Sequence, residues 1–145
     1  MYRIPIYTVS LVRERSQAAE KKVISSPMDA YRILNEYIGD ADREHFVVMF
    51  LDTRNTARGI HTASIGSLNA SCVHPRETFK TAILANAAAV ILCHNHPSGD
   101  PDPSPEDLTL TTRLVEAGAL LGIAVLDHII LGDERFISLK ERGVI

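Results

Sequence analysis

The apolar positions of the chain fall into short runs that predict strands and into spaced stripes that predict helices. Residues 46–51 and 88–93 are short continuous apolar runs, and runs of this length that contain valine favour buried strands over helices. Strands are also predicted over residues 2–12 and 59–68. Two more, 124–131 and 135–139, are joined by a turn at Gly132-Asp133.

Helix-start signals separate these strands. A helix is predicted to begin after the N-cap Ser26, where Asp29 completes a capping box, and to end at Gly39. Another begins at Pro75, and Ser104-Pro105-Glu106-Asp107 repeats the start signal for a third. The inward stripe expected of the third helix is Leu108, Thr111 and Val115.

Strands interleaved with three helices predict an α/β fold: a single layered domain with a mixed β-sheet flanked by helices. We expect one domain over residues 1–145. Within it, residues 1–25 form an N-terminal strand and connector, and residues 26–145 form the core. A length of 145 residues is ordinary for one domain.

Composition narrows the function classes. The longest apolar run, residues 87–93, is far shorter than the ~20 residues of a membrane span, so no membrane partner is expected. No signal-peptide pattern is evident, and a cytoplasmic protein is expected. The net charge of −3 gives the molecule no general attraction to nucleic acid. The two cysteines, Cys72 and Cys93, lack CxxC spacing, so we expect both to be reduced and packed.

The segment HNHPSGDPDPSPED, residues 94–107, carries the clearest chemistry. Side chains alternate along a strand, so His94 and His96 point the same way and can converge on one ion. A loop dense in Pro, Gly and Asp then returns the chain, so that Asp107 can supply a third ligand. Three protein ligands leave one tetrahedral position open for water, as in catalytic zinc sites, and coordination lowers the pKa of that water to roughly 7.

Each part of this motif has a simpler interpretation. His-x-His alone is a weak signal, and Asp107 could serve only as the capping-box partner of Ser104. The chain contains its own control, because Ser26 and Asp29 share that pattern with no histidine nearby. The combination of a buried strand end, His-x-His, a stiff loop and Ser-x-x-Asp therefore predicts the metal site.

The spacing His94-x-His96-x7-Ser104-x2-Asp107 is the core of the JAMM (MPN+) metalloprotease motif. The chain most resembles the RadC family, in HNHPSGDPDPS, in HPRETF of residues 74–79 and in LDHIIL of residues 126–131. The similarity runs from about Ser26 onward. It implies a cytidine-deaminase-like JAMM/MPN fold, one Zn²⁺ held by the two histidines and the aspartate, and Ser104 stabilising the oxyanion.

The resemblance also implies an upstream glutamate that acts as general acid and base. Glu44, immediately before the strand at 46–51, is the best match, and Glu77 is its rival; the sequence does not decide between them. A third polar candidate, His128, is expected to be a buried, hydrogen-bonded strand histidine and not a ligand. Residues 97–103 and 52–58 are expected to frame the cleft.

The function this implies is hydrolysis of amide or isopeptide bonds in a protein or peptide substrate. One alternative is the DNA-repair role traditionally attached to the RadC family. The negative charge, and the absence from this sequence of the helix-hairpin-helix-like region of longer members, make direct DNA action less favoured. A non-catalytic MPN scaffold is the other alternative. Base-deaminase chemistry is disfavoured because PCxxC ligands are missing, and neither the substrate nor the oligomeric state can be read from the sequence.

Overall fold

The fold is built on one five-stranded sheet with the order β2-β1-β3-β4-β5. A computed structural model describes residues 1–66 and 73–145. The strands are β1 (His45–Leu51), β2 (Ala57–Ile65), β3 (Ala89–Asn95), β4 (Ala124–Leu131) and β5 (Phe136–Ser138). Strands β3 and β4 are parallel and the other neighbours are antiparallel. The mixed sheet confirms the predicted fold class.

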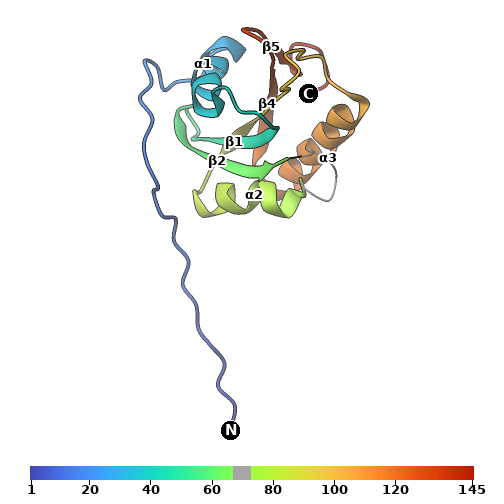
Figure 1. The fold of residues 1–145 in the computed structure, drawn as a ribbon. Helices are drawn as coiled ribbons and strands as arrows, with labels where there is room; N and C mark the ends of the chain where they lie inside the picture. Colours follow the sequence, from blue (N-terminus) through green and yellow to red (C-terminus); the bar gives the residue numbers. More distant parts are fainter. Residues whose placement is uncertain (67–72) are drawn as a thin grey trace.

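Three helices cover the two faces of this sheet (Figure 1). Helix α1 (Pro27–Ile38) packs on one face, mainly against β4 and β3. Helices α2 (Pro75–Leu84) and α3 (Pro105–Leu121) pack on the other face, α2 over β1 and β2 and α3 over β4. The domain therefore has three layers, with the sheet in the middle.

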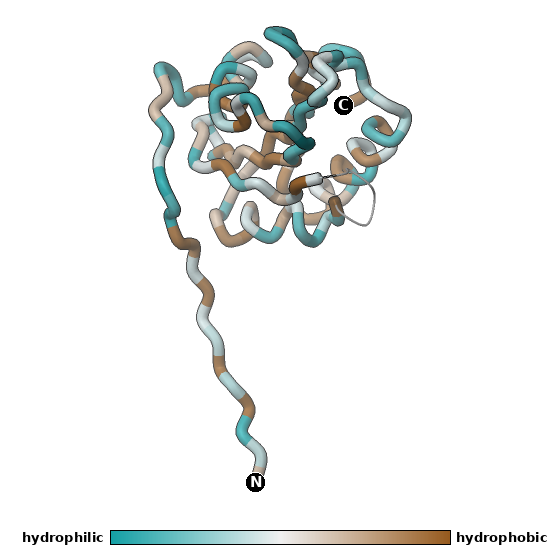
Figure 2. The backbone as a smooth tube through the Cα atoms, viewed as in Figure 1, coloured by the Kyte–Doolittle hydropathy of each residue, from teal (hydrophilic) through white to brown (hydrophobic). Residues whose placement is uncertain are grey.

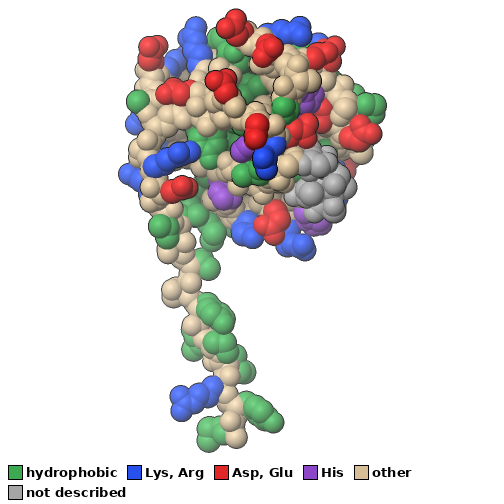
Figure 3. Space-filling view, viewed as in Figure 1, with side chains coloured by type: hydrophobic (Ala, Val, Ile, Leu, Met, Phe, Trp, Pro, Cys, Tyr) green, Lys and Arg blue, Asp and Glu red, His purple; other side chains and the backbone are tan. Residues whose placement is uncertain are grey.

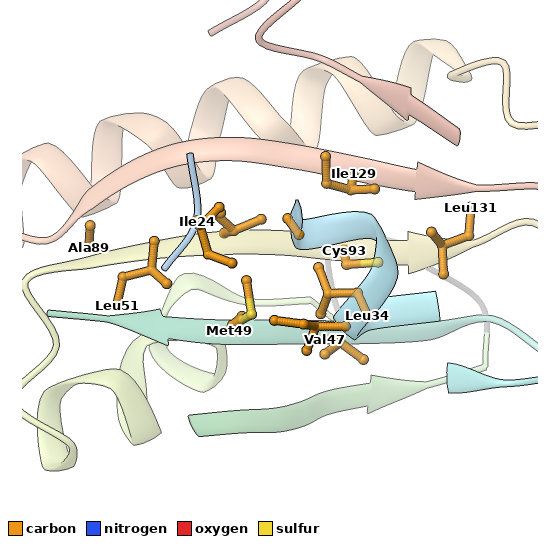
Figure 4. Close-up of a cluster of buried hydrophobic side chains, with 12 residues drawn as sticks. Ile24, Leu34, Val47, Met49, Leu51, Ala89, Cys93, Ile129 and Leu131 are labelled. Carbon is orange, nitrogen blue, oxygen red and sulfur yellow. The ribbon is translucent and has the colours of Figure 1, made fainter. Parts of the chain in front are cut away.

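Alternation along the central strands divides the interior into two apolar cores. Val47, Met49 and Cys93 belong to the core beneath α1, as Figure 4 shows for that cluster. Val48 and Leu92 belong to the core beneath α2 and α3. In Figure 2 the backbone tube is largely brown, the hydrophobic end of the scale, where it runs through the middle of the domain. The alternation matters for function because it directs the next residue of β3, His94, to the α2 and α3 side.

The helices begin where the sequence predicts. Ser26 and Ser104 are N-caps with complete capping boxes, and Pro75 occupies the first turn of α2. Of the stripe predicted for α3, Thr111 is fully buried and Val115 packs, partly buried, against the core, whereas Leu108 is half-buried and belongs to neither core. The buried face of α3 consists of Asp107, Leu110, Thr111, Leu114 and Gly118. This face therefore carries two polar residues, Asp107 and Thr111, into the interior.

The strand predicted over residues 2–12 is wrong. Residues 1–16 are exposed and form no ladder with any described strand. The N-terminal part of this segment extends away from the domain (Figures 1 and 3), whereas the Arg15 guanidinium lies over the Tyr37 ring. The apolar pattern of Tyr2, Ile4 and Ile6 predicts an extended backbone, but a strand also needs a hydrogen-bonding neighbour. The first such contact lies further along, where Val23 bridges Thr56.

Two other expectations concern the segment between β2 and α2. The strand predicted over 59–68 corresponds to β2, and Leu68 lies outside the described residues, as does Cys72. Cys93 is fully buried, as predicted, and burial raises the pKa of its thiol. No helix in the described part of the chain is long and apolar enough to cross a bilayer.

Candidate metal centre

Three side chains that could hold a metal ion converge at the end of β3. His94 is the second-last residue of β3 and is buried, His96 follows just after the strand, and Asp107 lies in the first turn of α3. The Nε2 atoms of the two histidines are 3.0 Å apart. Asp107 Oδ1 is 3.3 Å from His94 Nε2, and its Oδ2 is 3.2 Å from His96 Nε2.

The prolyl loop between the histidines and α3 is held against the β4–β5 turn. The Asp133 N–H donates to the Gly99 carbonyl, and the His96 N–H donates to the Leu131 carbonyl. Gly99 has a φ of +92°, and a Cβ added at Gly132 would collide with the carbonyl of Gly99. The close packing of two glycines thus fixes the path that returns the chain from His96 to Asp107.

The proton of His96 is directed away from the cluster. His96 Nδ1 lies 2.7 Å from the carbonyl oxygen of Asp100, which can only accept, so the ring donates from Nδ1. The neutral ring then presents the lone pair of Nε2 to Asp107. This acceptor-only arrangement around one point suits a bound cation.

Charge reinforces the cluster. The hydrogen bond to Asp107 raises the pKa of His96 above its ordinary value, against an opposing effect of burial. Burial alone would raise the pKa of Asp107, but the hydrogen bonds from His94 and His96 outweigh it, and the pKa of Asp107 is lowered. Asp107 is therefore an anion, which favours a cation between it and the imidazoles.

The spacing of the donor atoms fits a small tetrahedral ion. Ligand bonds of about 2.0–2.1 Å, as zinc forms with imidazole, place the corners of a tetrahedron about 3.3 Å apart. The separations of 3.0, 3.2 and 3.3 Å among the three side chains approach that value. Two imidazole nitrogens and one carboxylate are also a donor set of catalytic zinc sites. Among the described residues, these three are the ones whose donor atoms lie close enough together to hold one ion.

Asp107 serves both as a cap and as a member of the cluster, so the two interpretations of the sequence are not exclusive. Its backbone N–H donates to Ser104 Oγ over 3.1 Å, and the Ser104 N–H donates to its Oδ2 over 2.9 Å. Asp29 makes the same box with Ser26, but its Oδ2 accepts from Lys21 Nζ at 2.9 Å. The local fold is shared, and only the surroundings of the carboxylate differ.

The two candidate glutamates lie in different surroundings. The antiparallel β1–β3 register ends with Phe46 opposite His94, so Glu44, two residues before Phe46, lies at the same end of the sheet as His96. The charge of Glu44 contributes to the raised pKa of His96. Glu77 lies on an exposed part of α2, where its carboxylate is 2.8 Å from Lys80 Nζ. The geometry favours Glu44, whose catalytic role stays a prediction.

His128 is a buried, hydrogen-bonded strand histidine, as predicted. Its side chain is fully buried on β4 and contacts His94 and Thr111 through its two ring nitrogens. Burial, followed by the nearby charge of His94, lowers the pKa of His128. The sequence predicts Thr111 only as part of an inward stripe and gives no signal of its contact with this ring.

One expectation about the cleft is wrong. The turn at residues 52–58 lies at the opposite end of the sheet from the histidines, because β1 runs antiparallel to β3 and pairs Leu51 with Ala89. The loop at residues 97–103 does border the cluster, since it connects His96 to Ser104 and the carbonyl of Asp100 binds His96.

The fold and the cluster define a class: a three-layer α/β domain with a His-His-Asp site that could hold a metal ion at a strand end. The family model for the RadC-like JAB domain matches residues 24–144, and the chain belongs to this family. A UPF0758 protein of Desulfitobacterium hafniense is 56% identical over 125 residues, which cover 86% of this chain and 55% of that protein.

Other relatives give the same result. A UPF0758 protein of Shouchella clausii is 55% identical over 130 residues, covering 90% of this chain and 56% of the relative. One of Methanosarcina mazei is 52% identical over 125 residues, covering 86% and 55% respectively. The chain thus spans about half the length of these curated relatives, and their names state no activity.

Proposed function

We propose that this protein is a zinc-dependent hydrolase that cleaves amide or isopeptide bonds. The observation that carries the proposal is the convergence of His94 Nε2, His96 Nε2 and the Asp107 carboxylate within 3.0–3.3 Å of one another, with no fourth protein ligand among the described residues. Membership in the RadC-like JAB family supports it.

His94, His96 and Asp107 would hold the ion. A divalent ion with an open position acts as a Lewis acid on a carbonyl and lowers the pKa of a coordinated water to about 7. The three side chains fix where this occurs, at the edge of the sheet where β3 ends. His94 is fully buried and His96 retains some exposure, so a substrate would approach from the His96 side.

Two more residues would complete the chemistry. Glu44, whose charge acts on His96, would take a proton from the attacking water and deliver it to the leaving amine. Ser104 Oγ already accepts the Asp107 N–H, so the hydroxyl hydrogen can be donated outward. In our proposal it stabilises the oxyanion that develops on the substrate carbonyl.

The charge distribution gives less support to a nucleic-acid substrate. The net charge is −3, and on the face in Figure 3 acidic and basic side chains are interspersed without forming a basic patch. Phosphate binding depends on clustered Lys and Arg. Action on DNA and a silent scaffold role are therefore alternatives for the experiment to exclude.

The test is hydrolysis by the zinc-loaded protein of two probe sets: quenched fluorescent peptides, and peptides joined through a lysine side chain. We expect chelator-sensitive cleavage of an amide bond that is lost in His96→Ala. A matched reaction with labelled single-stranded and duplex DNA should show no cleavage. Zinc-dependent DNA cleavage, or tight zinc binding with no hydrolysis of any probe, contradicts the proposal.

A further inference from the structure

The buried ligand His94 touches a chain of polar groups that the proposed hydrolysis does not use. His94 Nδ1 lies 2.7 Å from His128 Nε2, and His128 Nδ1 lies 2.6 Å from Thr111 Oγ1. The Thr111 hydroxyl donates over 2.7 Å to the backbone carbonyl of Asp107. The chain of contacts thus begins at one ligand residue and ends at another.

The direction of each hydrogen bond follows from its last acceptor. A carbonyl oxygen only accepts, so the single hydroxyl hydrogen of Thr111 is used on Asp107. Thr111 Oγ1 must then accept from His128, which places the proton of that neutral ring on Nδ1. His128 Nε2 has no hydrogen and accepts from His94 Nδ1.

These hydrogen bonds determine which ring nitrogen of His94 carries the proton. With its proton on Nδ1, a neutral His94 presents the lone pair of Nε2 to Asp107 and His96. We propose that Thr111 and His128 are positioning residues that hold His94 in the tautomer able to bind the ion. This inference rests on the metal binding contained in the proposed function.

The backbone of β4 is adapted to this arrangement. Val90 pairs with Val125 but Ile91 pairs with Asp127, so Leu126 is an extra residue on β4. Val125 faces the α2 and α3 core, and simple alternation would send His128, three residues later, to the α1 side. The extra residue reverses the alternation and aims His128 at His94, a use of bulges that recurs beside functional sites.

The same device is present in a simpler form at His96, where the carbonyl of Asp100 holds the Nδ1 proton directly. Both imidazoles therefore present Nε2 to the cluster. For His94 the acceptor is the His128 side chain, which is connected through Thr111 to a backbone carbonyl by two further hydrogen bonds. These side chains can be altered by substitution.

The experiment compares threonine variants by zinc affinity, measured in competition with a chromophoric chelator. Thr111→Val removes the hydroxyl at nearly constant volume and is expected to weaken zinc binding about 10–100-fold. Thr111→Ser keeps the hydroxyl and should bind like the wild type. Thr112→Val is the matched control, because Thr112 makes the same bond to the carbonyl four residues earlier but is exposed.

Imidazole ¹⁵N spectra of the zinc-free protein at alkaline pH test the tautomers without any metal. We expect protonated Nδ1 and unprotonated Nε2 for both His94 and His128, with His94 losing this preference in Thr111→Val. A proton on Nε2 of either ring in the wild type overturns the inference, as does wild-type zinc affinity in a folded Thr111→Val. If the wild type shows the expected tautomers but binds no zinc, the proposed function is overturned. The hydrogen-bond chain from Thr111 through His128 to His94 is then still supported.

Discussion

Asp29 and Asp107 occupy the same position in two equivalent capping boxes, yet only Asp107 faces imidazoles. The two residues therefore separate the structural role of the motif from its chemistry. Each carboxylate accepts a backbone N–H from its N-cap serine, Ser26 or Ser104. Asp29 also accepts from Lys21, whereas Asp107 lies 3.2–3.3 Å from the two histidines.

The first prediction uses this pair. Asp107→Asn should reduce zinc affinity by more than about 100-fold, because a ligand is lost and not merely an outer-shell contact. Asp29→Asn should bind zinc like the wild type. Because an Asn side chain can still accept from the N-cap, both zinc-free variants should stay folded, although Asp107→Asn also gives up the stabilising hydrogen bonds from His94 and His96. Equal zinc binding by the two variants would show that Asp107 is only a cap.

The second prediction concerns pH. Zinc needs the neutral form of His96, whose pKa is raised above 6.5, mainly by the hydrogen bond to Asp107. Below that raised pKa the ion must displace a proton, so zinc affinity should fall about tenfold per pH unit as pH decreases. Calorimetry in buffers of different ionisation enthalpy should record this proton release. Affinity and proton release that do not change between about pH 6 and 8 would contradict the assignment of His96.

The raised pKa of His96 also determines how the stability of the zinc-free protein changes with pH. A histidine whose folded pKa exceeds its unfolded value stabilises the fold fully below the unfolded value. That contribution of His96 is lost as pH rises through the folded pKa, above 6.5. The zinc-free protein should therefore lose this stabilisation with rising pH, while zinc binding strengthens. Urea unfolding of the two forms across this range should give opposite slopes.

The third prediction separates the glutamates. Glu44→Gln should keep zinc but lose about 10²–10⁴-fold in hydrolysis, the usual contribution of a general base. Since the charge of Glu44 contributes to the raised pKa of His96, an NMR titration of this variant should also show a lower pKa for His96. Glu77→Gln removes an exposed partner of Lys80 and should change neither quantity. The opposite outcome would transfer the catalytic role to Glu77.

The fourth prediction tests the packing of α3. A Cβ at Gly118 would collide with the carbonyl of Ile123 and press on the Phe79 ring. Ile123 cannot easily retreat, because its N–H donates to the Gly118 carbonyl over 2.9 Å. Gly118→Ala should destabilise the domain by about 1–2 kcal/mol, since overpacking outweighs the helix preference of alanine. The exposed control Glu116→Ala should stay within about 0.5 kcal/mol by chemical denaturation.

The parts of the structure that sequence predicts well are the local ones. The capping boxes at Ser26 and Ser104 depend on four consecutive residues, and His94 and His96 converge because strand alternation is a local rule. Residues 2–12 have the composition of a strand, but no strand in the described part of the chain pairs with them. Pairing is a property of the whole fold, so composition could not decide it.

The role of Thr111 and His128 shows a second limit. Counting along β4 from Val125 places His128 on the wrong face unless the extra residue Leu126 is known. The signal in the sequence was a histidine within the conspicuous LDHIIL segment, which indicated burial but no partner. Likewise the distance of residues 52–58 from the cluster follows from strand direction, which the apolar pattern of β1 does not contain.

The most direct test of the account is a crystal structure of the zinc-loaded protein with anomalous data at the zinc edge. We predict one zinc ion about 2.0–2.2 Å from His94 Nε2, His96 Nε2 and an Asp107 carboxylate oxygen, with the remaining position taken by solvent. A zinc ion bound elsewhere, ligation through Nδ1, or a protein side chain in the fourth position would contradict it.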